Sequence, residues 1–397
     1  MEYRFSDKLA ELRPSAIREI FKSLSDPQII SFAAGNPAAE SFPIDDIRRL
    51  SADIFENTPV AALQYSRTEG YPPLCRAVAE RQKKKFGIGA EGDETIIVSG
   101  GNQGIELTAK VLCNEGDVVI CEEPSFIGAL NAFRSNGARP VGVPLSSDGI
   151  DPDMLDAVLS GEPRARFIYL IPTFQNPAGI TTSAEKRRRI YEVARRHDML
   201  ILEDNPYGEL RFAGDDVPTI KSLDTDGRVI YCSSFSKILS AGMRVGYVTA
   251  PAPIISKMVV AKQVEDVHTN IFFQMLCYRY MTECDLDGHV REIQSIYRRK
   301  CGLMLGSLER ELPASIEFTR PEGGLFVWCT LPHGCDMNEF VREALRHRVA
   351  VVPGTAFLCD PCGTSRSFRV NYSTPSDDEI REGCRRLGET ARALGIN

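Results

Sequence analysis

Lys237 occupies a setting that suits amine chemistry. It lies in the segment SSFSKILSAGMRVGY (233–247), directly after an apolar run and close to serines and an arginine. A lysine at the buried end of a strand loses hydration, which lowers its pKa and makes the neutral amine available to attack a carbonyl carbon. Ser234 and Ser236 add hydroxyl groups, and Arg244 adds a fork of N–H donors that suits phosphate oxygens. The segment predicts a reactive amine beside an anion site, although its sequence is equally consistent with a surface lysine in a polar loop.

Two further apolar runs end in polar side chains. ILEDNPYGEL (201–210) ends its run at Asp204 and continues to Tyr207. A buried carboxylate is costly without a cationic partner, and a protonated pyridine nitrogen would be such a partner. LIPTFQNPAGITTS (170–183) contains Asn176, whose amide could contact a ring oxygen together with the Tyr207 phenol. Taken singly, Asp204 could cap the next turn and Asn176 could belong to a plain Asn-Pro turn.

A fourth segment, VSGGNQGIELTAKVL (98–112), reads as a strand, a Gly-rich turn and a helix. Backbone N–H groups at a helix N-terminus attract anions. The glycine spacing matches neither a Walker loop nor G-x-G-x-x-G, so it favours a single phosphate over a nucleotide. In open α/β sheets, ligands bind outside the carboxyl ends of the strands. All four segments place their polar residues there, and this combination predicts one shared site.

The central part of the chain alternates apolar runs with helical patterns. The runs are continuous and do not alternate with polar residues, which favours strands buried on both faces. They cover 95–100, 117–123, 166–173, 199–204, 228–236 and 244–251. The clearest helical pattern covers 184–197, and Thr182 and Glu185 have the spacing of a capping box in front of it. The alternation predicts an α/β fold with a mainly parallel, seven-stranded-type sheet.

The last third has a different pattern. Charged helical segments cover 285–312 and 336–348, and strand-like segments cover 323–331 and 367–373. This order predicts a smaller α+β domain. We expect an N-terminal segment (1–45) that joins the small domain, a large α/β domain (46–284) and a small C-terminal domain (285–397).

Composition narrows the function classes. With 43% hydrophobic and 25% charged residues, the chain has the composition of an ordinary globular protein. Its net charge of −7 argues against nucleic acid or an anionic membrane surface as the main partner. The apolar runs are of strand length, too short to cross a bilayer, and MEYRFSDKLAEL (1–12) has no apolar signal core. We therefore expect a cytoplasmic location.

Cysteines do not predict a metal site. Several of the twelve, among them Cys113, Cys121 and Cys232, lie in apolar runs and read as small buried thiols. Cys359 and Cys362 form a single C-x-x-C, without the second pair that a four-ligand zinc site requires. We expect reduced thiols and no metal.

The ordered set of motifs resembles the class I and II aminotransferases, which have the fold of aspartate aminotransferase. Within that superfamily the pattern is most similar to the 2-aminoadipate/kynurenine-type branch. The resemblance extends over nearly the whole chain, from SFAAGNPAAESFP (31–43) through LQYSRTEGYPPL (63–74) to FRVNYS (368–373). It implies pyridoxal 5′-phosphate as cofactor and a homodimer with shared active sites.

The resemblance also implies roles for individual residues. Lys237 would carry the cofactor as a Schiff base and then act as acid and base, Asp204 would pair with the pyridine nitrogen, and Asn176 and Tyr207 would contact the ring oxygen. The group expected around the phosphate consists of Gly101, Asn102, Ser234, Ser236 and Arg244. Gly101 stands where relatives often have serine, so its contact would come from the backbone alone.

Further roles fall on residues outside these segments. Tyr65 would reach a phosphate across the dimer interface, and Phe126 would stack on the ring, where many relatives have tyrosine and an additional hydroxyl contact. Arg369 would hold the α-carboxylate of the substrate through two hydrogen bonds. Asn36 would line the site. Arg18 could read a distal carboxylate, or could lie on a helix surface.

These features predict a ping-pong aminotransferase that exchanges an amino group between an amino acid and a 2-oxo acid, with 2-oxoglutarate as the acceptor by analogy with the family. One alternative is a lyase or decarboxylase with the same cofactor, since orientation of the substrate decides between these reactions. Another is a non-catalytic ligand-sensing domain of a transcription regulator. The acidic charge, and a catalytic pattern that begins by residue 31, argue against the regulator.

Overall fold

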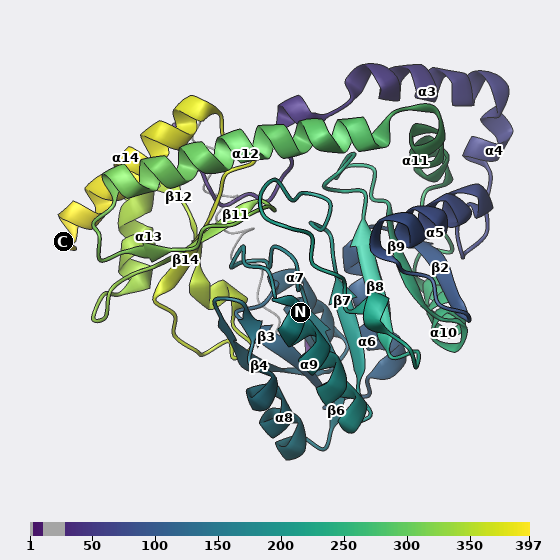
Figure 1. Cartoon of the computed structure of the whole chain (residues 1–397), viewed down its shortest axis with the longest axis horizontal. Helices are drawn as coiled ribbons and strands as arrows, with labels where there is room; N and C mark the ends of the chain where they lie inside the picture. Colours follow the sequence, from purple (N-terminus) through teal and green to yellow (C-terminus); the bar gives the residue numbers. More distant parts are fainter. Residues whose placement is uncertain (1–2, 11–27) are drawn as a thin grey trace.

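The computed structural model describes residues 3–10 and 28–397. A large part is built on one wide sheet, and a smaller part contains the C-terminus (Figure 1). The helix α12 (Leu286–Glu311) runs along both parts. Among the described residues, no helix is both long enough and apolar enough to cross a lipid bilayer.

The large sheet has the strand order β2-β9-β8-β7-β6-β3-β4-β5. The strands β8, β7, β6, β3 and β4 pair in parallel, whereas β9 is antiparallel to both of its neighbours and β5 is antiparallel to β4. The bounds are β2 Asp93–Val98, β3 Val118–Glu123, β4 Arg139–Ser146, β5 Gly149–Ile150, β6 Ala165–Leu170, β7 Leu200–Asp204, β8 Val229–Ser234 and β9 Gly246–Pro251. The α/β class and the mainly parallel sheet are confirmed, with β5 as a two-residue addition to seven longer strands.

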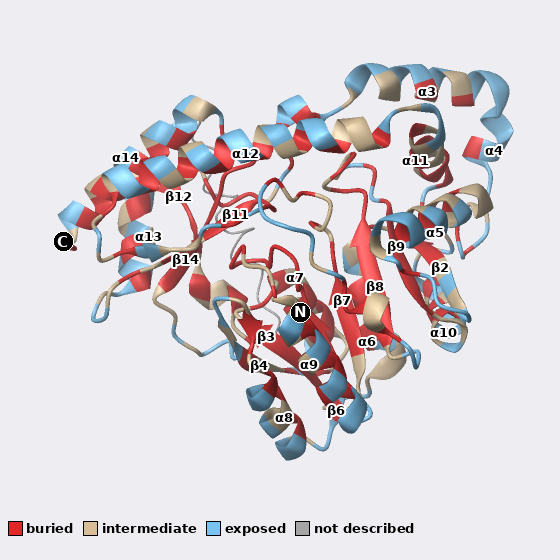
Figure 2. Cartoon of the chain, in the orientation of Figure 1, coloured by how far each residue is buried: buried red, intermediate tan, exposed pale blue. Residues whose placement is uncertain are grey.

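Helices cover both faces of this sheet, which explains the continuous apolar runs. Along β3, Val118 and Ile120 belong to one hydrophobic core, while Val119 and Cys121 belong to another. Successive side chains of a strand point to opposite faces, so these two cores lie on opposite sides of the sheet. The side chains of α8 (Pro152–Gly161) and α9 (Ala184–Arg196) enter the first core, and those of α6 (Gly101–Leu112) and α7 (Ile127–Ser135) enter the second. In Figure 2 the strands are correspondingly buried.

Further helices pack around β2, which is an edge strand of the large sheet, and near the first residues of α12. They are α3 Ile44–Asn57, α4 Pro59–Leu63, α5 Pro72–Phe86, α10 Ala252–Glu265 and α11 Ile271–Glu283, with α1 Asp7–Ala10 near α7 and the short turns η1 Ala39–Ser41 and η2 Lys221–Leu223.

The smaller part contains an antiparallel sheet of order β10-β11-β14-β13. Its elements are β10 Glu317–Phe318, β11 Phe326–Thr330, α13 Met337–Arg346, β12 Val349–Ala350, β13 Val352–Pro353, η3 Gly354–Phe357, β14 Ser367–Asn371 and α14 Asp377–Ala393. The strand β1 (Ile30–Ser31) pairs in parallel with β12, so residues near the N-terminus join this part. The proposed boundary after residue 284 falls just before α12, and the division into domains remains a prediction.

One strand was not expected and two local expectations need correction. The strand β4 was not among the runs expected from the sequence, and it contains Pro140 and Pro144, a residue type that is uncommon within strands. The cap of α9 is Ser183, whose hydroxyl accepts a hydrogen bond from the Lys186 N–H, and not Thr182. Cys113 is only half-buried, because it lies at the C-cap of α6.

A capping box fixes the start of α14. The Ser376 hydroxyl accepts a hydrogen bond from the Glu379 N–H at 3.2 Å, and the Glu379 carboxylate accepts one from the Ser376 N–H at 2.7 Å. We expect Ser376→Ala to lower the free energy of unfolding by about 1 kcal/mol, because the Glu379 N–H at the start of the helix loses its side-chain acceptor. The midpoint of urea unfolding measures this loss. Ser160→Ala, at an exposed helical serine that caps nothing, is the control, and an equal shift in both variants would contradict the capping role.

Candidate active site

A pocket of about 280 Å³ opens at the carboxyl edge of the large sheet. Residues at or after the ends of β2, β3, β6, β7 and β8 line this pocket. Further lining residues come from the segment after β1 and from β11 and β14. Twelve of the residues expected from the sequence line it together: Asn36, Gly101, Asn102, Phe126, Asn176, Asp204, Tyr207, Ser234, Ser236, Lys237, Arg244 and Arg369.

The structure does not place two further expected residues in this lining. Tyr65 lies just after α4 with 82% of its surface exposed, and its ring packs edge-on against His268. Arg18 lies outside the described residues. Among the described residues, the pocket is therefore lined without Tyr65.

Lys237 points its amine into the pocket from the turn after β8. Its Nζ donates a hydrogen bond to the Gly35 carbonyl oxygen at 2.7 Å. Removal from bulk water, together with the positive charges of Arg369 and Arg244, lowers the pKa of Lys237 to about 8. Close to neutral pH a larger fraction of this amine is therefore uncharged and nucleophilic than for a lysine in water.

Asp204 lies fully enclosed at the end of β7. The Tyr169 phenol donates a hydrogen bond to its Oδ2 at 2.8 Å. Burial raises the pKa of Asp204 to about 7, and the Tyr169 hydrogen bond opposes this rise. No lysine, arginine or histidine within residues 3–10 and 28–397 forms an ion pair with this carboxylate. The carboxylate is therefore poised to accept a cationic group from a ligand.

The opposite end of the pocket is rich in donors. The Ser234 hydroxyl donates to Ser236 Oγ at 2.7 Å, and Arg244 Nη1 lies 3.3 Å from the same oxygen. Here α6 begins, and Gly100, with φ of +82°, allows the chain to turn into it. A Cβ at Gly100 would collide with the Arg244 guanidinium, so glycine is required for both the backbone angle and the close approach. The first N–H groups of α6 and the arginine together form an anion cradle.

Arg369 projects from β14 between two phenyl rings. Its guanidinium lies 4.1 Å from the centre of the Phe326 ring and 5.0 Å from that of Phe357. It donates to Asn176 Oδ1 and to the Ala33 carbonyl oxygen, both at 2.8 Å. Its Nε is buried and has no hydrogen-bond partner among the described residues. Burial lowers the pKa of Arg369 to about 10, so the side chain remains a cation with an unused donor.

Phe126 forms one wall of the pocket at the start of α7. A Cβ at Gly128 would strike the Phe126 ring and approach Asn102 Oδ1 at 2.9 Å. Glycine at this position therefore gives the ring room to lie where it does.

Sequence reasoning missed several residues of the site. Gly35, Ile105, Ile171, Pro206, Ala241 and Phe326 complete the lining. Phe326 lies in the segment 323–331, which was expected to be a strand. The sequence of this segment does not show which face of the strand lines the pocket. Tyr169 was not recognised because it lies in the middle of the apolar run FIYLI (167–171), where a tyrosine reads as a core residue.

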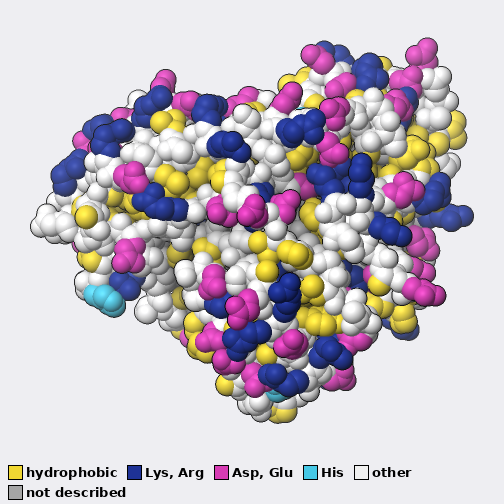
Figure 3. Space-filling view, viewed as in Figure 1, with side chains coloured by type: hydrophobic (Ala, Val, Ile, Leu, Met, Phe, Trp, Pro, Cys, Tyr) yellow, Lys and Arg dark blue, Asp and Glu magenta, His cyan; other side chains and the backbone are white. Residues whose placement is uncertain are grey.

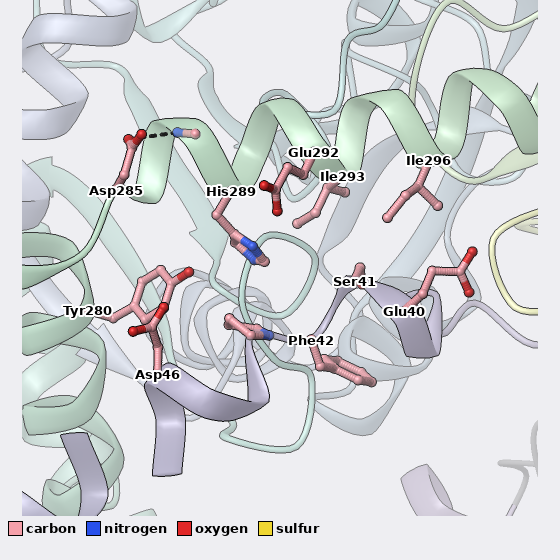
Figure 4. Close-up of a pocket in the computed structure, with 12 residues that line it drawn as sticks. Glu40, Ser41, Phe42, Asp46, Tyr280, Asp285, His289, Glu292, Ile293 and Ile296 are labelled. Atoms are coloured by element: carbon pink, nitrogen blue, oxygen red, sulfur yellow. Dashed lines mark hydrogen bonds between the residues drawn. The ribbon is translucent and has the colours of Figure 1, made fainter. Parts of the chain in front are cut away.

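A second pocket, of about 360 Å³, lies between α12 and the N-terminal segment (Figure 4). Its lining includes four carboxylates and His289. None of the expected site residues that the structure describes lines this pocket, so it is separate from the constellation around Lys237.

The family comparison agrees with this geometry. Residues 27–387 match the family model "Aminotransferase class I and II". The match covers most of the chain, and the chain belongs to this family.

Individual relatives are similar over their whole length. The chain is 38% identical to aromatic-amino-acid aminotransferase 1 of Thermococcus litoralis, over 98% of this chain and 94% of the relative. It is 39% identical to the 2-aminoadipate transaminase of Thermus thermophilus, over 98% of this chain and 97% of the relative. A crystal structure of the α-aminoadipate aminotransferase of Thermus thermophilus, complexed with N-(5′-phosphopyridoxyl)-L-leucine, superposes with a TM-score of 0.91 at 38% identity, covering 98% and 97% of the two chains.

Asp204→Asn tests the electrostatic state of the buried carboxyl in the protein without ligand. Below about pH 4 the carboxyl is protonated in both the folded and the unfolded chain and has no effect on stability. As pH rises towards 7, the unfolded chain ionises first, so the wild type loses stability relative to the variant, by roughly 4 kcal/mol at most. Thermal unfolding at pH 5 and pH 8 measures this difference.

The matched control is Asp198→Asn, because the Asp198 side chain is 99% exposed. We expect the advantage of Asp204→Asn over the wild type to grow from pH 5 to pH 8 and that of the control to stay constant. A pH-independent difference for Asp204→Asn would contradict the raised pKa.

Proposed function

We propose that this chain is a pyridoxal-phosphate-dependent aminotransferase that moves an amino group between an amino acid and a 2-oxo acid in a ping-pong cycle, with 2-oxoglutarate as the acceptor. The observation that carries the proposal is one pocket with a lysine amine of lowered pKa, an unpaired buried carboxylate and an anion cradle. Membership of the aminotransferase family and the phosphopyridoxyl complex of a relative support it.

The residues of the pocket fit this cofactor on three counts. Asp204 has no cationic partner within the described part of the chain, and a pyridinium nitrogen would supply one. The start of α6 and Arg244 offer donors for a phosphate, and Ser234 and Ser236 add two hydroxyls. Phe126 offers an apolar wall for an aromatic ring.

In this assignment each side chain holds one part of the cofactor. Ser234, Ser236, Arg244 and the N–H groups of Gly101 and Asn102 would hold the phosphate. Asn176 and Tyr207, whose polar atoms lie 3.4 Å apart, would hold the ring oxygen.

When bound, pyridoxal phosphate supplies an aldehyde that condenses with amines and a protonated ring that takes up the electron pair left at the Cα of the substrate. Asp204 keeps the ring nitrogen protonated, and the Tyr169 hydrogen bond keeps the Asp204 carboxylate in place. Nζ of Lys237 moves the proton at the Cα of the substrate, a contribution of roughly 10²–10⁴ to the rate.

Arg369 is the residue that orients the substrate. Its unpartnered Nε and its neighbouring Nη groups suit a carboxylate, and Phe326 and Phe357 keep its plane fixed. Fixing the α-carboxylate selects which bond at Cα breaks, and this favours transamination over decarboxylation.

The proposal includes a homodimer in which Tyr65 of one subunit reaches the phosphate of the other. Its high exposure, and the exposed Val60 and Leu63 on the adjacent α4, support an interface at this surface. The cytoplasmic location expected from the sequence remains a prediction.

Lys237→Ala is the direct test of the function. We expect the purified wild type to absorb at the edge of the visible range through its lysine-bound pyridoxal group, and the variant to lack this band because no amine is available. Addition of an amino donor should convert the wild-type spectrum to that of the amino form, and 2-oxoglutarate should reverse it. Lys257→Ala, at an exposed lysine of α10, is the control. A wild-type spectrum that 2-oxoglutarate cannot restore would favour a lyase or decarboxylase instead.

Arg369→Ala tests the carboxylate contact. We expect kcat/KM for the amino donor to fall about 10- to 100-fold, mainly through a higher KM, because a charged hydrogen-bonding partner is lost. Cofactor content, measured by absorbance after release in alkali, should not change. Arg381→Ala, at an exposed arginine of α14, should match the wild type in both measurements. Loss of cofactor from Arg369→Ala would contradict the assignment.

A further inference from the structure

Lys262 is a fully buried lysine on α10 that does not line the pocket around Lys237. Most lysine and arginine side chains lie at the surface, as Figure 3 shows for one face of the molecule, where water hydrates them. Burial of an ammonium group costs free energy unless hydrogen bonds and an opposite charge compensate for it. The partners of Lys262 are therefore the place to look for its role.

The amine of Lys262 connects the ends of two helices. Its Nζ donates to the two carboxylate oxygens of Asp266, the C-cap residue of α10, at 2.8 and 2.9 Å. It also donates to Thr269 Oγ1 at 3.0 Å and to Gln103 Oε1 at 2.8 Å. Gln103 belongs to the first turn of α6, where the anion cradle lies. The amine is thus bonded both to the end of its own helix and to the start of α6.

Ser99, which precedes the cradle, is held at each of its polar groups. Its N–H donates to Gln103 Oε1 and its hydroxyl donates to Asp266 Oδ2, both at 2.7 Å. Its carbonyl oxygen accepts a hydrogen bond from Arg244 Nη2 at 3.3 Å. Gln103 Oε1 and Asp266 Oδ2 are also the acceptors of the Lys262 amine. The position of Ser99 therefore depends on Lys262 through two shared acceptors.

The turn that follows Ser99 carries the N–H groups assigned to the phosphate. Gly100 makes this turn with its left-handed φ, and Gly101 and Asn102 begin α6. The Gln103 N–H donates to the Gly100 carbonyl oxygen at 3.1 Å, so the backbone of Gln103 braces the turn that its side chain also holds. A single residue separates Ser99 from the cradle, so a displacement of Ser99 reaches the N–H groups directly.

The chain after Asp266 is held in an unfavourable conformation. Val267 has a φ of +63°, a left-handed value that a β-branched residue rarely adopts. Lys262 bonds to residues on both sides of it, Asp266 and Thr269, and Thr269 Oγ1 lies 3.1 Å from the Ser99 hydroxyl oxygen. Strain of this kind persists only where the surroundings over-determine the backbone, and it clusters near functional sites.

We propose that Lys262 is a positioning residue for the cofactor phosphate. Its ion pair with Asp266 fixes Ser99, and Ser99 in turn fixes the first N–H groups of α6 and the Arg244 guanidinium. The inference rests on the proposed function, because the phosphate is that of pyridoxal phosphate. Asp266 balances the charge of Lys262, so the contribution of Lys262 lies in the geometry of the cradle.

A residue that only stabilises the fold would have a different effect on binding. General loss of stability weakens the binding of every part of the cofactor, whereas a displaced cradle weakens the phosphate contact alone. Pyridoxal, which lacks the phosphate, separates these two cases because it can still condense with Lys237.

The experiment compares pyridoxal 5′-phosphate with pyridoxal on the full chain, purified free of cofactor. Absorbance of the lysine-bound form gives each dissociation constant, at a temperature well below the unfolding midpoint of every variant. We expect Lys262→Met, which keeps the apolar part of the side chain, to weaken pyridoxal phosphate binding about tenfold, because the cradle must then be ordered on binding. Pyridoxal binding should not change.

Ser99→Ala is the milder second variant. It removes the hydroxyl contact with Asp266 and keeps the ion pair of Lys262, so it tests the same connection without leaving a buried charge unpaired. We expect the same selective loss for pyridoxal phosphate, of about threefold, in line with the loss of one hydrogen bond.

Lys221→Met is the matched control for Lys262→Met. The Lys221 side chain is 1% exposed and pairs with Asp93 and Asp224 at 2.9 and 3.0 Å. Asp93 begins β2, whereas the pocket lies at the ends of the strands. This variant should lower the unfolding midpoint and leave the ratio of the two dissociation constants as in the wild type.

An unchanged ratio in Lys262→Met or in Ser99→Ala, or an equal change in Lys221→Met, would overturn the proposal. If Lys262→Met fails to fold, Ser99→Ala decides alone. A wild type that takes up neither compound would overturn this inference together with the proposed function. A wild type that binds pyridoxal phosphate but is not restored by 2-oxoglutarate would overturn the proposed function alone, because the phosphate contact is measured without transamination.

Discussion

The carboxylate of Asp204 is the constraint around which the large sheet is organised. It lies at the end of a central strand with a phenol on one side, and no cation in residues 3–10 and 28–397 forms an ion pair with it. Parallel pairing of β7 with β6 and β8 brings the ends of neighbouring strands to the same edge, where Asn176 and Lys237 follow. Burial of a carboxylate without a cationic partner costs free energy, and a bound cation would offset this cost.

The pocket is polarised from one end to the other. Arg244 and the start of α6 make one end positive, and Asp204 lies at the other end. Burial, together with the charges of two arginines, lowers the pKa of the Lys237 amine between them. Arg369 comes from the smaller part of the molecule, held between aromatic rings. Each titratable group therefore depends on elements that are far apart in the chain.

The sequence predicted those parts that carry chemistry at strand ends. Runs of apolar residues followed by a polar residue are local signals, so Asp204 and Lys237 could be recognised without a structure. The strand β4 could not, because it lies next to the short edge strand β5, where the sheet tolerates the prolines that otherwise exclude a strand. Tyr169 was equally hidden, since which phenol reaches Asp204 depends on the register between β6 and β7.

The pairing of β1 with β12 has a consequence for biosynthesis. Ile30 lies opposite Val349, so the first strand has no partner until the ribosome has made most of the chain. The large sheet can form earlier, because all its strands precede residue 252. The Gly35 carbonyl, which accepts the hydrogen bond from Lys237, follows β1 and is therefore expected to reach its final position late. The anion cradle at the start of α6 can form earlier, while the chain is still being synthesised.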